Sequence, residues 1–285
     1  MEVIRDVVAM QQHCLSLRKD GRSIGLVPTM GALHEGHLSL LRIAREQSDV
    51  SVVSIYVNPT QFGPSEDLAT YPRPFDRDCE LAEQNGCSVI FAPSDESMYA
   101  QPYSTHVEVE GITAGLCGAF RPGHFRGVTT VVLKLLNIVV PTVAVFGQKD
   151  AQQALVIRRM VRDLNVPVTV MVGPTIREED GLAVSSRNVY LSAEERTDAA
   201  LINAGLRELV GAYEAGERDP QALKDVCAAV IARSRMLRIE YLEVVDTVLV
   251  EAVASVEGKA LVAVACRTTG TNTRLIDNVM LGGEL

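Results

Sequence analysis

The chain has 285 residues, of which 47% are apolar and 22% are charged, so it can bury one large core or two smaller ones and is not disordered as a whole. Twenty-seven Lys and Arg against 36 Asp and Glu give a net charge of −9, which disfavours general nucleic-acid binding. Residues 1–6 carry charges where a secretory signal needs an apolar run, and the apolar run 131–146 is interrupted and too short to span a membrane. We therefore expect a cytoplasmic protein without a membrane segment.

Short β-branched runs alternate with helical patterns along the first part of the chain. The runs at 23–28, 50–57, 88–91, 143–146 and 168–172 are almost continuously apolar, as in strands covered on both faces. The apolar helical positions between them are Ile4, Val7, Val8 and Leu15, then Val128, Val131, Val132, Leu135, Leu136 and Val139, then Ile157, Met160, Val161 and Leu164. This alternation predicts an α/β fold with a doubly wound parallel sheet, whose ligands bind beyond the carboxyl ends of the strands.

The pattern changes after Gly173. A long helical stretch covers 193–215, a break rich in turn residues follows, and a second helix precedes two strand-like runs around Tyr241 and Val262. We expect a first domain over residues 1–175 and a smaller α+β domain over 176–285.

The first of the long apolar runs leads into a glycine-containing loop and then into a helix. Gly31 and Gly36 allow close approach of the backbone, and the N–H groups at the start of the helix favour an anion such as phosphate. His34 and His37 are three positions apart, so both rings can face that anion, where imidazolium would offset charge developing on phosphorus. A zinc site and ordinary surface or core histidines are the alternatives, although Glu35 does not fit the HExxH arrangement.

This loop resembles the HxGH signature of the adenylyl-transferring superfamily, which includes class I aminoacyl-tRNA synthetases and small nucleotidyltransferases. Together with further motifs in the same order, the chain is similar to the pantothenate synthetase (pantoate-β-alanine ligase) family over nearly its whole length. The motifs are residues 27–37, 57–62, 121–127, 147–153, 185–188 and 274–278. The resemblance implies a Rossmann-like first domain, a smaller domain acting as a lid, and a homodimer. It also implies ATP-dependent condensation of (R)-pantoate with β-alanine through pantoyl adenylate, with Mg²⁺.

The resemblance also implies which residues bind ATP. They are Met30, Gly31, Ala32, Leu33, His34, Glu35, Gly36, His37, Gly147, Gln148, Lys149, Asp150, Ile176, Val184, Ser185, Ser186 and Arg187. The expected catalytic residues among them are His34, His37, Lys149, Ser185, Ser186 and Arg187. Lys149 follows a strand and can act as a point charge for phosphate, with a solvated lysine as the alternative. Ser185, Ser186 and Arg187 can follow the departing pyrophosphate, with an ordinary polar loop as the alternative.

Neutral polar residues are the candidates for binding the acid substrate. Asn58 and Gln61 come directly after the second long strand, and their amides can both donate and accept hydrogen bonds, although an Asx-type turn also explains Asn58. The resemblance implies that Gln61 and Gln153 hold pantoate and that Arg121 lies beside the pantoate pocket. A structural cap is the alternative for Arg121. Asp78 is the expected carboxylate near Mg²⁺, with a helix N-terminal carboxylate as the alternative.

Other functions remain open on the sequence alone. A simple nucleotidyltransferase would need a basic site for a phosphorylated acceptor, and Asn58, Gln61 and Gln153 are neutral. A synthetase that acts on tRNA would need a basic surface that the acidic second domain lacks. A non-catalytic nucleotide sensor is the third alternative.

Overall fold

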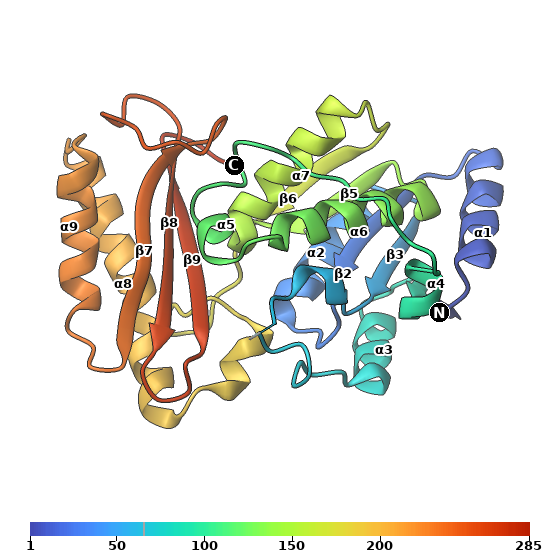
Figure 1. The fold of residues 1–285 in the computed structure, drawn as a ribbon, viewed down its shortest axis with the longest axis horizontal. Coiled ribbons are helices and arrows are strands. Elements are labelled where there is room, and N and C mark those ends of the chain that lie inside the picture. Colours follow the sequence, from blue (N-terminus) through green and yellow to red (C-terminus); the bar gives the residue numbers. More distant parts are fainter. Residues whose placement is uncertain (65) are drawn as a thin grey trace. The chain divides into compact units, whose positions relative to one another are not determined.

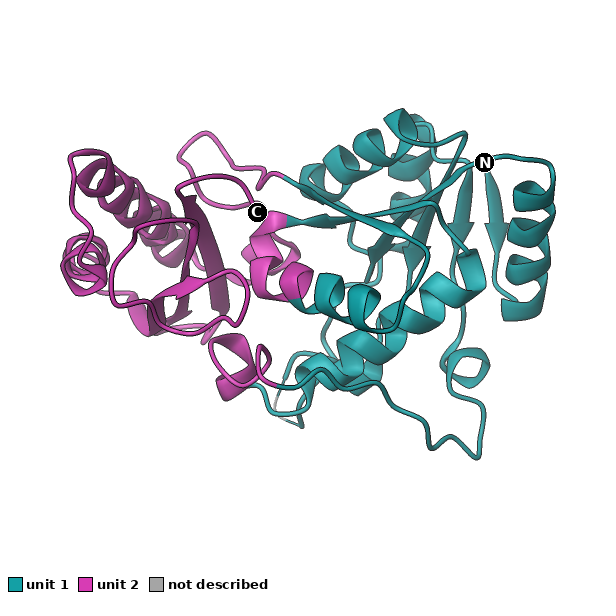
Figure 2. Cartoon of the chain, turned by 90° about the horizontal axis from the view of Figure 1, so that it is seen from above, with its two compact units in different colours: residues 1–110, 121–147, 156–173 teal, residues 111–120, 148–155, 174–285 magenta. Residues whose placement is uncertain are grey.

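The computed structural model describes residues 1–64 and 66–285 and divides the chain into two compact units (Figure 2). Unit 1 comprises residues 1–110, 121–147 and 156–173. Unit 2 comprises residues 111–120, 148–155 and 174–285. The second unit thus takes two earlier segments in addition to the C-terminal part of the chain, an arrangement that a single boundary after residue 175 does not describe.

Unit 1 is built around a six-stranded parallel sheet with the strand order β1-β4-β3-β2-β5-β6 (Figure 1). The strands are β1 Glu2–Ile4, β2 Ile24–Thr29, β3 Val50–Ile55, β4 Val89–Phe91, β5 Val143–Gly147 and β6 Thr169–Gly173. The chain winds outward from β2 through β3 and β4, and in the opposite direction through β5 and β6. The topological switch point therefore lies between β2 and β5, at the carboxyl ends where this class of sheet binds ligands. The predicted doubly wound sheet is confirmed.

Helices cover this sheet, and the most apolar of them was predicted correctly. The helices of the first 163 residues are α1 Val7–Lys19, α2 Glu35–Glu46, α3 Phe75–Gln84, α4 Asp95–Met98, α5 Cys117–Phe120, α6 His124–Val139 and α7 Ala151–Asp163. Of these, α5 and residues 151–155 of α7 belong to unit 2. Short 3₁₀ helices are η1 Pro59–Gln61 and η2 Gln148–Asp150. All the apolar positions expected on α6 are buried in the core, so that prediction is confirmed.

The expected buried face of α1 was wrong. Val8 and Leu15 are exposed, whereas Met10 and Cys14, four positions apart, are fully buried. The reason is that Ile4 belongs to strand β1, and the helix begins only after Asp6, whose side chain caps it by accepting from the Ala9 N–H. The periodicity was thus counted from a residue outside the helix.

Unit 2 contains a three-stranded antiparallel sheet, β7 Leu237–Asp246, β8 Ala260–Thr268 and β9 Arg274–Leu281. Helices α8 Ala193–Glu214 and α9 Pro220–Ile231 pack against it around a core of their own. A further 3₁₀ helix, η3, spans Ser186–Tyr190. The two helices and the first two strands follow the sequence prediction. The third strand, β9, comes from residues that were recognised only as a motif.

A buried carboxylate joins α8 to the turn between β8 and β9. Glu195 is fully buried and accepts hydrogen bonds from the backbone N–H groups of Ser192, Gly270 and Thr271, at 3.0, 3.0 and 2.7 Å. Burial by itself raises the pKa of Glu195, but the surrounding donors outweigh it and lower the pKa from 4.5 to about 2. Glu195 therefore stabilises unit 2 in its ionised form.

Replacing Glu195 with glutamine should lower the free energy of unfolding by about 2 kcal/mol at neutral pH, because an amide cannot satisfy all of these donors. Because the pKa of Glu195 is lower in the folded than in the unfolded protein, its contribution to stability is complete above pH 4.5. That contribution is lost as the pH falls toward the folded-state pKa of about 2. The difference between parent and variant should therefore shrink as the pH falls from 4.5 toward about 2. Urea unfolding across this range measures it, with the exposed neighbour Glu194→Gln as control. A difference that stays constant with pH contradicts the assignment.

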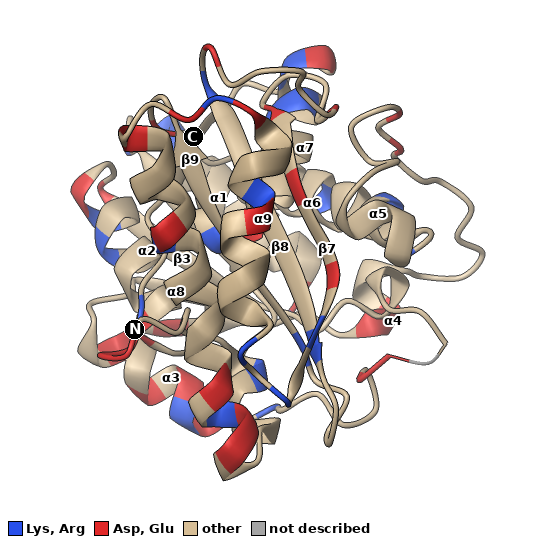
Figure 3. Ribbon diagram, turned by 90° about the vertical axis from the view of Figure 1, so that its left-hand side faces the viewer, with Lys and Arg blue, Asp and Glu red and all other residues tan. Residues whose placement is uncertain are grey.

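Charged residues of both signs occur along several elements. Both α3 and α9 carry basic and acidic side chains (Figure 3). Within residues 1–64 and 66–285, no helix has the length and apolarity needed to cross a membrane.

Candidate active site

The loop between β2 and α2 is held in place by Asp78. One carboxylate oxygen, Oδ2, accepts from the Ala32 N–H at 2.8 Å, and the other, Oδ1, accepts from the Leu33 N–H at 2.7 Å. Asp78 is only 1% exposed and lies in the first turn of α3. Burial raises the pKa of Asp78, and its two backbone donors act in the opposite direction. Asp78 therefore fixes the path of the loop.

Glycine at position 31 is required by this arrangement. Gly31 has a φ of +80°, and a Cβ atom there would lie 2.9 Å from Oδ2 of Asp78. Ala32 also has a positive φ, of +49°. The loop thus combines a left-handed backbone with close contact to a buried carboxylate, and only glycine meets both conditions without strain.

The two histidines stand together at the start of α2. Their ring centroids are 4.0 Å apart with an interplanar angle of 24°, and the His37 N–H donates to the His34 carbonyl at 2.8 Å. A Cβ atom on Gly36 would lie 2.9 Å from Cε1 of His34, so the absence of a side chain at position 36 leaves room for the His34 ring. The Glu35 carboxylate pairs with Arg42 along the surface of the helix. The structure therefore brings both imidazoles to a helix N-terminus at the switch point of the sheet.

Asn58 caps the short helix η1 that follows β3, and Gln61 is the last residue of that helix. The Asn58 amide donates to Oε1 of Gln61 at 3.0 Å and to the Gly127 carbonyl at 3.2 Å, while its Oδ1 accepts from the hydroxyls of Tyr99 and Thr60 at 2.8 and 2.9 Å. It also accepts from the Thr60 N–H, which is the Asx-type turn considered above. Because Asn58 is engaged within the protein on both sides of its amide, its geometry is that of a residue that orients Gln61.

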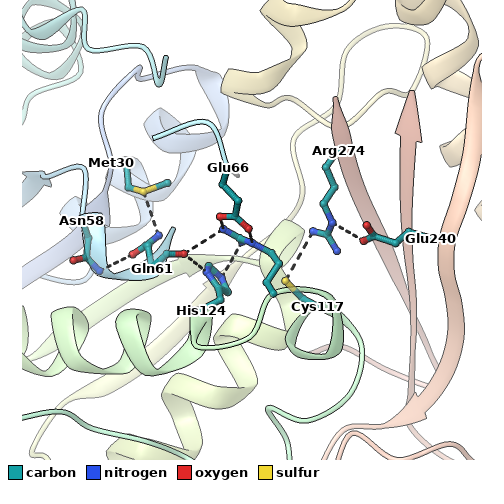
Figure 4. A network of polar contacts seen from close by, with 9 residues as sticks. Met30, Asn58, Gln61, Glu66, Cys117, His124, Glu240 and Arg274 are labelled. Atoms are coloured by element: carbon teal, nitrogen blue, oxygen red, sulfur yellow. Dashed lines mark hydrogen bonds and ion pairs between the residues drawn. The ribbon is translucent and has the colours of Figure 1, made fainter. Parts of the chain in front are cut away.

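The backbone of Gln61 is held by a second set of polar contacts (Figure 4). His124 Nδ1 lies 2.9 Å and Arg121 Nη2 lies 3.3 Å from the Gln61 carbonyl oxygen. Arg121 also makes a two-pronged ion pair with Glu66, with both N···O distances 2.6 Å. Although burial raises the pKa of Glu66, Arg121 outweighs it, so the net shift is downward. The geometry of Arg121 is therefore that of a residue supporting Gln61, and its contact with substrate remains a prediction.

In unit 2, a turn follows β5 and carries Lys149. Gln148, Lys149 and Asp150 form η2, and the Lys149 ammonium lies 3.6 Å from Oδ2 of Asp150. Gln153 is half-buried in the first turn of α7. Gly147 ends β5 directly before this turn. Lys149 is thus placed just beyond the carboxyl end of a central strand, as the sequence predicted.

The Ser185–Arg187 segment begins η3. The Ser185 side chain caps that helix by accepting from the Arg187 N–H at 3.3 Å. Directly before it, the Val184 N–H donates to the Ile176 carbonyl at 2.9 Å, which closes a hairpin over residues 176–184. The segment is therefore anchored on a folded hairpin.

Several supporting residues were not predicted from the sequence. Tyr99, Glu66 and His124 act on Asn58 and Gln61 only through contacts across at least 41 positions of the chain. His124 lies in one of the recognised motifs, but Glu66 and Tyr99 carry no sequence signal. Among the residues that the structure describes, no group of three or more His, Cys, Asp or Glu side chains could hold a metal ion.

The strand order of the parallel sheet reverses beside a strand-to-helix turn that carries two stacked histidines. This combination defines an enzyme of the Rossmann-like α/β class. The family model of pantoate-beta-alanine ligase matches residues 2–280. Pantothenate synthetase of Moorella thermoacetica is 52% identical over 281 residues, 99% of each chain. The chain belongs to the pantoate-beta-alanine ligase family. Formation of pantothenate is the activity that this membership supports.

Solved structures agree with this assignment. The pantothenate synthetase of Thermus thermophilus has a TM-score of 0.93 and 42% identity, covering 98% of this chain and 99% of that one. The pantoate-beta-alanine ligase of Francisella tularensis has a TM-score of 0.80 and 32% identity, with coverage of 98% and 97%. That ligase was solved as a complex with beta-gamma ATP and beta-alanine.

Proposed function

We propose that the chain condenses pantoate with β-alanine at the expense of ATP, through a pantoyl-adenylate intermediate. The observation that carries the proposal is the stacked His34–His37 pair at the N-terminus of α2, on a loop held by Asp78. Family membership supplies the acid and the amine, and the nucleotide and β-alanine complex of the Francisella relative supports ATP as the activating substrate.

In the first half-reaction, a carboxylate oxygen of pantoate attacks the α-phosphorus of ATP. The new bond is O–P, the bond to the β-phosphate breaks, and pyrophosphate leaves with the electron pair. The main barrier is the approach of one anion to another. The imidazoles of His34 and His37 and the N–H groups that begin α2 lower this barrier by electrostatic stabilisation of the α-phosphate.

Unit 2 supplies further cationic and hydroxyl groups for the leaving pyrophosphate. Lys149 and Arg187 balance its negative charge, and the hydroxyls of Ser185 and Ser186 donate hydrogen bonds to its oxygens. As the resemblance to the family implies for the smaller domain, we also propose that the second unit acts as a lid that excludes water from the acyl adenylate.

In the second half-reaction, the neutral amine of β-alanine attacks the activated acyl carbon. A C–N bond forms, the C–O bond to AMP breaks, and the nitrogen loses a proton to solvent. Gln61 and Gln153 hold pantoate by their amides, and Asn58 orients Gln61. No covalent bond to the enzyme is needed. By its resemblance to the family, we propose that the chain acts as a homodimer.

Magnesium enters this proposal as part of the substrate MgATP. Asp78 is the metal ligand expected from the sequence, and each of its carboxylate oxygens already accepts a hydrogen bond from a backbone N–H. The described residues contain no group of three or more His, Cys, Asp or Glu side chains that could hold a metal ion. Bound with ATP, the ion would supply further positive charge to the phosphates. The protein groups described above orient the nucleotide.

The proposal is tested by supplying substrates one at a time. ATP and pantoate alone should release pyrophosphate and leave an enzyme-bound pantoyl adenylate that mass spectrometry detects. AMP should accumulate only after β-alanine is added. Pyrophosphate release that does not depend on pantoate, or AMP release without an adenylate of pantoate, would point to a different nucleotidyl transfer.

Replacing Gln61 with alanine should weaken pantoate binding about tenfold or more, because a buried amide that binds the acid is lost, while ATP binding survives. Titration calorimetry with each substrate separates the two effects. Gln12→Ala, an exposed glutamine on α1, is the matched control. Equal weakening of both substrates would show that the loss is structural.

A further inference from the structure

Two adjacent residues of β9, Asp277 and Asn278, are buried and polar, and the proposed reaction assigns them no role. They are 4% and 3% exposed. Successive side chains of a strand point to opposite faces, so the pair can hold two different segments at once. Arg274, at the start of the same motif, instead pairs with Glu240 of β7 at 2.6 Å and ties the sheet together (Figure 4).

Asn278 holds the turn that carries Lys149. Its amide nitrogen donates to the carbonyls of Gln148 and Lys149 at 2.8 and 3.0 Å, and its oxygen accepts from the Gln148 side chain at 3.4 Å. An amide is the side chain that donates to two carbonyls and accepts from a third group at the same time. Asn278 therefore fixes the backbone from which the Lys149 side chain projects.

Asp277 holds the hairpin over residues 176–184. Its carboxylate makes a two-pronged ion pair with Arg177, at 2.6 and 3.0 Å, and also accepts from the Asn278 N–H at 2.7 Å. Arg177 in turn donates to the Gly181 carbonyl at 3.1 Å, across the hairpin. The pair has the parallel geometry that gives an arginine–carboxylate contact directional precision. Asp277 thus fixes the hairpin against β9.

The hairpin leads directly into the Ser185–Arg187 segment, and side-chain hydrogen bonds of the next residue, Asn188, join the two. Asn188 donates to Oε1 of Glu178 and to the Ala183 carbonyl, both at 3.2 Å. Arg196 of α8 pairs with Glu178 and Asp180, each at 2.5 Å. A shift of the hairpin would therefore carry Ser185, Ser186 and Arg187 with it.

We propose that Asp277 and Asn278 are positioning residues that set the spacing between Lys149 and the Ser185–Arg187 segment, from one point on β9. The inference rests on the proposed function, in which these two segments contact the phosphates of one ATP molecule. Because both segments lie in unit 2, β9 serves as their common base. Fixed spacing of the groups that contact the leaving pyrophosphate is what adenylate formation requires.

Amide hydrogen exchange tests the two attachments separately from catalysis. Asn278→Ala should speed exchange over residues 148–152 and leave 176–188 unchanged, whereas Asp277→Asn should do the reverse. Because Asp277→Asn leaves the half-buried Arg177 without its charge partner, the double variant Asp277→Asn/Arg177→Gln serves if the single variant does not fold. Glu243→Gln on β7 of the same sheet is the control. It breaks the ion pair between Glu243 and Lys224 of α9 and should alter neither segment.

Kinetics then test positioning. Asn278→Ala should slow pantoate-dependent pyrophosphate release on the order of 10- to 100-fold. The attack of β-alanine on preformed pantoyl adenylate should change less than about twofold, because the pyrophosphate has already left. If Asn278 acts through Lys149, the double variant Asn278→Ala/Lys149→Ala should be no slower than Lys149→Ala alone. Asn278→Ala combined with Arg187→Ala should show the product of the two separate effects.

Each result bears on the proposal. Exchange that rises in the expected segment, together with a non-additive Asn278–Lys149 pair, supports it. Uniform exchange across unit 2, or effects of Asn278 and Lys149 that multiply, overturns it. If Lys149→Ala releases pyrophosphate at the parental rate, the proposed function is wrong for Lys149 and the positioning role falls with it. The segment-specific exchange would still be seen, which distinguishes that failure from a failure of the attachments.

Discussion

Replacing His37 with alanine should slow pantoate-dependent pyrophosphate release about 10²- to 10³-fold, the usual cost of removing one preorganised group that stabilises transition-state charge. The ring of His37 stacks on that of His34, with centroids 4.0 Å apart, and His37 belongs to the first turn of α2, at the positive end of the helix dipole. The loss should appear in adenylate formation, since charge builds on the α-phosphate there. His37 is only half-buried as a residue, so the fold should tolerate the removal of its side chain.

The measurement is single-turnover pyrophosphate release at saturating ATP and pantoate, with thermal unfolding followed in parallel. His13→Ala is the matched control, because His13 is a partly exposed histidine on α1, outside the β2–α2 loop. It should retain the parental rate. A His37→Ala enzyme whose pyrophosphate release stays within a few-fold of the parent would remove the basis of the proposed mechanism.

Much of the fold could be predicted because its strongest signals are local. Strands β2, β3 and β5 are buried on both faces, so their sequences are almost continuously apolar, and α6 shows one apolar face across its whole length. The strand β1 has only three residues, too few for a pattern. Its absence from the prediction led to the wrong face of α1. The strand β9 contains charged and amide residues at buried positions, which conceals the apolar alternation of a strand.

In the candidate site, too, the residues that could be predicted are those with a local sequence signal. Residues that carry the proposed chemistry, such as His34, His37 and Lys149, lie at strand-to-helix turns and could be found from short segments. The contacts that support these residues could not be predicted, because each contact joins distant parts of the chain. Asp78 reaches Leu33 over 45 positions, and Asp277 reaches Arg177 over 100. Only the fold brings such pairs together, and no spacing in the sequence encodes them.

Replacing Asp78 with alanine should reduce both stability and rate. The N–H groups of Ala32 and Leu33 would lose their acceptors, and each unsatisfied buried donor costs about 1–3 kcal/mol, so we expect a loss of about 2–6 kcal/mol in the free energy of unfolding. The loop would also lose its fixed path ahead of His34. Pyrophosphate release should therefore fall on the order of 10²-fold, the effect of a displacement of about 1 Å in a catalytic group.

The response of the Asp78→Ala variant to added Mg²⁺ distinguishes a role in holding the loop from a role as a metal ligand. If Asp78 holds the loop, excess Mg²⁺ should not restore the rate, and urea unfolding without ligands should show the full loss of stability. If Asp78 instead bound the metal of MgATP, its removal would leave the unfolding free energy near the parental value, and raising Mg²⁺ would recover activity. Asp76→Ala is the control, since Asp76 is an exposed carboxylate in the same first turn of α3 and should change neither quantity. The geometry favours the loop, because both oxygens of Asp78 already accept backbone donors.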